Sequence, residues 1–188
     1  MSGGHAHLDA SNKKIALLIA VMALLLALAE TAGKSAQTDA INSNVEASNL
    51  WAFFQAKTIR MTNVRTAAED MTITRDVLTD AAAKAAMTRQ IEAWQRSAQR
   101  WDSEPETQEG RRELSARALA AEKKRDKKYK AYHDFEVASA AFQIGIVLAS
   151  ATVITGAFAL AWLAGGLGIV GIGFMALGVL APGTIHLF

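Results

Sequence analysis

Two apolar regions flank a charged middle, and this pattern dominates the chain. Ile15 to Ala29 is an unbroken apolar run, and Val137 to Phe188 contains no aspartate, glutamate, lysine or arginine. A helix that crosses a bilayer needs about 20 predominantly apolar residues. A water-soluble domain, in contrast, needs charged and polar residues over much of its surface. The pattern therefore predicts an integral membrane protein with spans at both ends.

The first apolar run follows Lys13 and Lys14 and ends in Ala27-Leu28-Ala29. A basic start, a short apolar stretch and an A-x-A site are also typical of a secretory signal. We expect a retained anchor, with a transmembrane helix over residues 13–32. Residues 1–12 are polar and are expected to form a mobile tail.

Gly165-Gly166 divides the C-terminal apolar region, with Trp162 just before it, where an interfacial aromatic residue belongs. The pattern predicts two further spans, over residues 137–164 and 167–188, joined by a tight turn at the two glycines. The alternative is one span followed by a re-entrant or interfacial segment. That alternative arises because glycine weakens helices and seven glycines occur from Gly165 onward.

The charged middle, residues 33–136, is predicted to be a helical stalk. From Lys34 to Glu104 it contains neither glycine nor proline, the residues that disfavour helix interiors most. Two apolar stripes with alternating spacings of four and three predict helices that pack as in a coiled coil. The first comprises Leu50, Phe54, Met61, Val64, Ala68, Met71 and Leu78, interrupted by Lys57 and Arg75; the second comprises Met87, Ile91, Trp94, Ala98 and Trp101.

One loop is evident in the middle, at residues 102–110, where one proline, one glycine and four acidic residues occur together. An outgoing helix to about Leu78 and two returning helices should form an antiparallel hairpin. The reversal is expected near Thr79–Lys84, and the last returning helix should start near Arg111 and continue into the membrane. The predicted fold is thus all-α, with three transmembrane helices and a coiled-coil-like helical hairpin outside the membrane.

Composition excludes several classes of function. The formal net charge of +2 is too small to indicate nucleic-acid binding, and the absence of cysteine excludes disulfides, thiolate catalysis and cysteine-ligated metals. No phosphate-binding loop, zinc-protease motif or nucleophile elbow is present. His5 and His7 make an incomplete zinc site and are expected to be solvated. We therefore predict no enzyme activity, cofactor, metal or identified small-molecule substrate.

A cluster of aromatic and basic residues is the densest chemical feature: Trp51, Phe53, Phe54, Gln55, Lys57 and Arg60. It could be a contact surface or a ligand cradle. The alternative is a packed helix seam with solvated bases, because aromatic residues at helical spacing usually belong to a core. The predicted residues of the seam or partner contact are Leu50, Trp51, Phe54, Met61, Met87, Ile91, Trp94 and Trp101.

A basic cluster precedes the second predicted span: Lys123, Lys124, Arg125, Lys127, Lys128 and Lys130. Bases next to a span favour anionic lipid headgroups, although Glu122 and Asp126 could leave a merely solvated face. The cluster outnumbers Lys13 and Lys14, so the charge rule favours a cytoplasmic middle. Within the span, Ala141, Gly145 and Ala149 recur at every fourth position, which predicts a face for close helix packing.

The segment Ala47–Arg60, ASNLWAFFQAKTIR, resembles an uncharacterised bacterial membrane-protein family catalogued as domain of unknown function 4337. The stretches Asn12–Ala20 and Lys34–Thr38 are similar to it as well. The resemblance implies a bacterial three-span protein and carries no activity. We expect the protein in the bacterial inner membrane. Our hypothesis is a membrane scaffold that self-associates or binds another membrane protein. The alternative is a subunit of a simple channel or transport complex.

Overall fold

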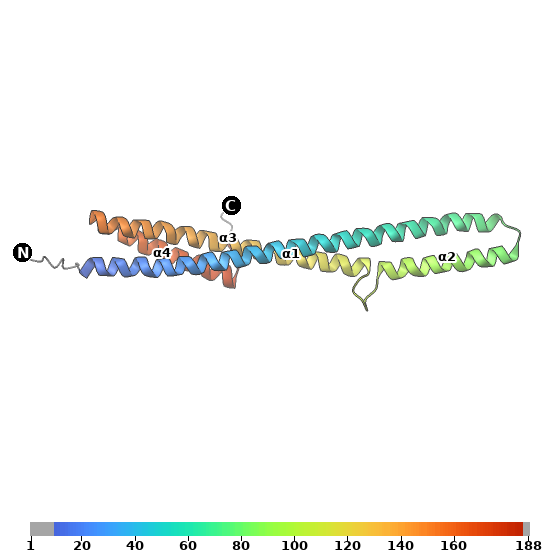
Figure 1. The fold of residues 1–188 in the computed structure, drawn as a ribbon, viewed down its shortest axis with the longest axis horizontal. Helices are drawn as coiled ribbons and strands as arrows, with labels where there is room; N and C mark the ends of the chain where they lie inside the picture. Colours follow the sequence, from blue (N-terminus) through green and yellow to red (C-terminus); the bar gives the residue numbers. More distant parts are fainter. Residues whose placement is uncertain (1–9, 186–188) are drawn as a thin grey trace, which may run out of the picture. The chain divides into compact units, whose positions relative to one another are not determined.

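The computed structural model describes residues 10–185, which fold into four α-helices with no strand among them (Figure 1). The helices are α1 (Ala10–Val77), α2 (Ala81–Asp102), α3 (Arg111–Thr155) and α4 (Phe158–Leu180). The all-α prediction is therefore confirmed for the described residues. Most of the predicted mobile tail, with His5 and His7, lies outside them.

The first predicted span and the outgoing part of the stalk form one uninterrupted helix, α1. The chain reverses at residues 78–80, although no glycine or proline marks the turn. Asp80 accounts for the start of α2, because its carboxylate accepts the backbone N–H of Ala82 at 2.9 Å, the usual role of an N-cap aspartate. The reversal expected near Thr79–Lys84 falls at the start of that range, and a connection at residues 103–110 precedes Arg111.

The break in the C-terminal apolar region differs from the prediction. It falls at Gly156–Ala157, whereas Gly165 and Gly166 lie inside α4. Gly156 has a φ of 71°, a left-handed conformation that glycine adopts without steric cost. The hydroxyl of Thr155 also accepts the N–H of Ala157 at 3.3 Å. The end of one helix predicted at residue 164 and the start of the next predicted at residue 167 were therefore wrong. Two adjacent glycines do not by themselves end an apolar helix.

The chain divides into two compact units. The three-helix unit comprises Met1–Ile41 and Arg125–Phe188, and the hairpin unit comprises Asn42–Lys124. Both α1 and α3 contribute residues to each unit.

In the three-helix unit, α1, α3 and α4 pack around Met22 and Phe142, which are fully buried. Glycines permit this contact. A Cβ at Gly171 would lie 2.6 Å from Cε1 of Phe142, and one at Gly145 would collide with the end of Met22. Ala141, Gly145 and Ala149 are all buried here, so these small residues pack within the chain.

The outside of the three-helix unit is apolar. Exposed large side chains include Leu17, Leu24, Ile144, Val147, Ile169 and Val179. Contiguous apolar surface is rare on soluble monomers and marks a membrane or protein contact. Among the described residues, α1, α3 and α4 each contain a stretch long and apolar enough to cross a membrane. Together these features indicate membrane association.

In the hairpin unit, α2 runs back alongside the second half of α1, and the start of α3 packs on the preceding turns of α1 (Figure 1). The core of that second contact consists of Ala47 and Leu50 from α1 and Leu114, Ala118 and Ala121 from α3. The small alanines allow the two helices to approach closely.

Candidate functional site

The predicted seam is packed within the hairpin unit. Leu50, Met61 and Ile91 are buried, and Trp51, Phe54, Met87, Trp94 and Trp101 are half-buried. The two polar residues that interrupted the stripe have partners: Lys57 lies 3.7 Å from a carboxylate oxygen of Glu104, and Arg75 pairs with Asp76. The seam holds the chain's own helices together, so these side chains do not form an open contact surface.

An aromatic corner joins α3 to α1. The indole N–H of Trp51 donates to Glu122 Oε1 at 2.9 Å, and the ring meets Phe54 edge to face, with centroids 5.4 Å apart. The guanidinium of Arg111 lies 5.7 Å from the Phe54 centroid, within the range of a cation–π contact. The sequence pattern identified Trp51 and Phe54, whereas their partners come from a distant part of the chain.

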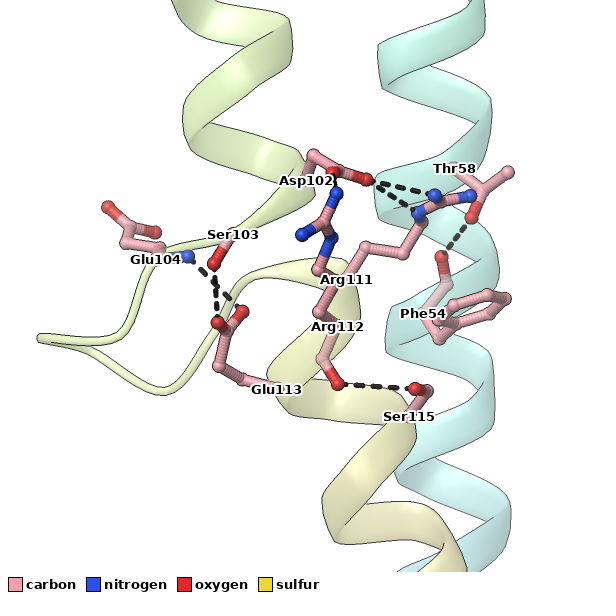
Figure 2. Close-up of polar contacts among 9 residues, drawn as sticks. All are labelled: Phe54, Thr58, Asp102, Ser103, Glu104, Arg111, Arg112, Glu113 and Ser115. Atoms are coloured by element: carbon pink, nitrogen blue, oxygen red, sulfur yellow. Dashed lines mark hydrogen bonds and ion pairs between the residues drawn. The ribbon is translucent and has the colours of Figure 1, made fainter.

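Figure 2 shows the joint between α2 and α3, where two carboxylates organise the loop at residues 103–110. Asp102 pairs with Arg111 and Arg112, each at 2.9 Å. Glu113 accepts the hydroxyl of Ser103 at 2.6 Å and the backbone N–H of Glu104 at 3.2 Å. These contacts tie the end of one helix to the first turn of the next.

The joint is expected to be sensitive to acid through Glu113. The hydrogen bond from Ser103 lowers the pKa of this carboxyl below its ordinary value, despite partial desolvation. Because the folded-state pKa is lower than the unfolded one, the stabilisation is complete above the unfolded pKa and is lost as pH falls through the folded pKa. Glu113→Gln should therefore reduce the loss of stability between neutral and acidic pH, measured by denaturant unfolding. Glu109→Gln, at an exposed loop position, is the control; an equal change in both variants would contradict the assignment.

A pocket of about 390 Å³ lies beside this joint. Its apolar lining comes from Leu50, Phe53, Ala56 and Leu114, and its charged lining from Lys57, Arg60, Arg117 and Glu109. The sequence pattern indicated Phe53, Lys57 and Arg60 as part of a possible ligand cradle. It missed Arg117 and Glu109, because only the folded hairpin brings α3 and the loop next to this part of α1.

A second feature of α1 is a stripe on the side turned away from the seam. We call it the outer stripe; its members follow spacings of four and three and are all exposed: Val45, Asn49, Ala52, Ala56, Ile59, Asn63, Thr66, Asp70, Ile73 and Val77. The outer stripe was not predicted from the sequence, because its small and polar residues weaken the periodicity of the apolar ones. Along α1, the residues of the outer stripe are exposed, whereas those of the seam are buried or half-buried.

The basic cluster before the second predicted span is only partly available. Lys128 pairs with Asp39 at 2.7 Å, and Arg125 pairs with Asp126 at 2.9 Å. Lys123, Lys124, Lys127 and Lys130 are exposed. In the described part of the chain, no group of three or more histidine or acidic side chains is placed to hold a metal ion.

Comparison with models of protein families gives a match. A family model described as Domain of unknown function (DUF4337) matches residues 11–181. No curated protein and no solved structure matches the chain.

Proposed function

We propose that this chain, which belongs to the family of domain of unknown function 4337, is a membrane scaffold without catalytic activity. Its three apolar helices would span the membrane, and the hairpin unit would lie outside it as a coiled-coil-like module. Two copies would associate through the outer stripe of α1. The exposure of that whole stripe is the observation that carries the proposal.

The outer stripe has the chemistry of a helix–helix interface. Ile59, Ile73 and Val77 are 60%, 69% and 78% exposed, so a partner would remove substantial apolar area from water, at about 25 cal/mol per Å². The spacing of four and three is that of a coiled-coil seam. A second copy is the natural occupant, because Asn49 and Asn63 lie on the stripe, and asparagine at such positions pairs with its own copy and fixes the register. Anchoring in one membrane favours parallel pairing.

One residue of the stripe opposes self-association. Asp70 is exposed on it, and parallel pairing would bring two Asp70 carboxylates together, a like-charge contact that is destabilising. The association should therefore be reversible. Asp70→Asn should strengthen it by removing this repulsion.

Replacing Ile59 by aspartate should weaken self-association at least tenfold, because it adds a charge where two apolar side chains meet. Ala86→Asp on the exposed face of α2 is the matched control. The measurement is the dimer dissociation constant of the full chain in lipid nanodiscs or mild detergent, by sedimentation or native mass spectrometry. A monomeric natural chain, or equal weakening by both variants, would refute association through the outer stripe.

We further propose that the protein is a multi-pass protein of the bacterial inner membrane, with the hairpin unit in the cytoplasm. The exposed bases Lys123, Lys124, Lys127 and Lys130 support this orientation, and each would gain about 1 kcal/mol near anionic headgroups. A Glu106→Cys variant, at an exposed loop position outside the outer stripe, tests it without interference from native cysteine. An impermeant maleimide should leave this cysteine unlabelled in intact cells and label it after permeabilisation, whereas prompt labelling in intact cells would reverse the orientation.

The packing of two glycines bears on the channel alternative. That alternative rested on glycine-rich spans lining a path, yet Gly145 and Gly171 face Met22 and Phe142 of the same chain. These glycines serve close packing in the three-helix unit.

A further inference from the structure

We propose that the pocket beside the joint binds a small amphiphile that combines one anionic group, a phosphate or a carboxylate, with a short hydrocarbon chain. The pocket lies within the hairpin unit, so the proposal does not depend on membrane insertion or on self-association. Its volume, about 390 Å³, falls in the range of small-molecule sites, roughly 300–1,000 Å³.

The apolar part of the pocket would hold the hydrocarbon chain. Leu50 and Leu114 belong to the core of the hairpin unit and present a rigid floor. Phe53 and Ala56 complete this lining from exposed positions on α1. An apolar floor with a few charged groups is the usual composition of a ligand site.

The charged lining selects an anion. The charged lining consists of three cationic side chains, Lys57, Arg60 and Arg117, and one carboxylate, Glu109. Lys57 lies 3.7 Å from a Glu104 oxygen, longer than a hydrogen bond, and Arg117 uses Nη1 to donate to the carbonyl of Gln108 at 3.2 Å. A guanidinium carries five N–H donors, so Arg117 keeps donors for a ligand.

The two arginines come from different helices. Arg60 lies on α1 and Arg117 on α3, and planar guanidinium groups suit the oxygens of phosphate and carboxylate. A hydrocarbon chain packed on the apolar lining would exclude water and so strengthen charge-assisted hydrogen bonds to the anionic group. The binding of the anionic group should therefore depend on both arginines.

The test is titration of the full chain in lipid nanodiscs with octyl phosphate, measured by calorimetry against empty nanodiscs. Inorganic phosphate and octanol carry only one half of the proposed ligand each. We expect saturable binding of octyl phosphate at one site per chain. Both half-ligands should bind at least tenfold more weakly.

Arg60→Gln and Arg117→Gln should each weaken the binding of octyl phosphate about tenfold, the effect of losing about 1.4 kcal/mol. Arg65→Gln, an exposed position on α1 outside the pocket, is the matched control and should bind like the natural chain. Equal binding by all three variants would overturn the proposal. So would inorganic phosphate that binds as tightly as octyl phosphate, or the absence of saturable binding above the nanodisc blank.

Discussion

Replacing Leu114 by aspartate is expected to unfold the hairpin unit. Leu114 is 3% exposed and packs in one cluster with Ala47, Leu50, Ala118 and Ala121. The variant loses a buried leucine and places a polar carboxylate inside an apolar cluster. Truncating a buried leucine alone costs about 2–5 kcal/mol, and the desolvation of the carboxylate adds to that cost. The sum approaches the total stability of a typical domain, about 5–15 kcal/mol.

Leu119→Asp is a closely matched control for this substitution. Leu119 lies on the same helix and is 55% exposed, so the same change of side chain should leave the fold intact. Hydrogen exchange of the full chain should show lost protection in α2 and in the first turns of α3 for Leu114→Asp only. Unchanged protection in Leu114→Asp would mean that the contact between α3 and α1 does not hold the unit together.

Replacing Gly171 by leucine should disrupt the three-helix unit. The Cβ of any side chain at Gly171 would lie 2.6–3.0 Å from three carbons of the Phe142 ring. Phe142 is fully buried, so its ring can give way only by displacing neighbouring side chains. Overpacking of a tight core costs about 1–3 kcal/mol and sometimes more. Leucine adds further atoms beyond the Cβ, so the effect should reach the upper end of that range.

Gly173 provides the control on the same helix, because no atom lies within 4 Å of a Cβ built there. Gly173→Leu should therefore be tolerated. The measurement is the unfolding of both variants in detergent by increasing denaturant, followed by circular dichroism. If Gly171→Leu and Gly173→Leu unfold at the same denaturant concentration as the natural chain, the packing of α4 against Phe142 is wrong.

The sequence predicted those features that depend on local periodicity. The absence of glycine and proline from Lys34 to Glu104, and the spacing of Leu50, Phe54 and Met61, predicted long packed helices. The loop before Arg111 followed from its proline, glycine and acidic residues. These signals are properties of neighbouring residues and need no tertiary information.

What the sequence did not predict depends on contacts between distant residues or on backbone conformation. The helix break lies at Gly156, which has a left-handed φ. Amino-acid composition does not reveal which glycine adopts that conformation. Arg117 joins Lys57 and Arg60 only after the hairpin closes. The outer stripe could be recognised only from the burial pattern of α1, because polar members such as Asn63 and Asp70 interrupt its apolar periodicity.

Ala56 belongs both to the outer stripe and to the wall of the pocket. The two surfaces are therefore neighbours on α1, and occupation of one can change the free energy of occupying the other. Thermodynamic linkage makes any such coupling reciprocal: a factor by which pairing changes ligand affinity is the factor by which the ligand changes pairing. A single alanine would then allow the concentration of an amphiphile to control the number of paired chains.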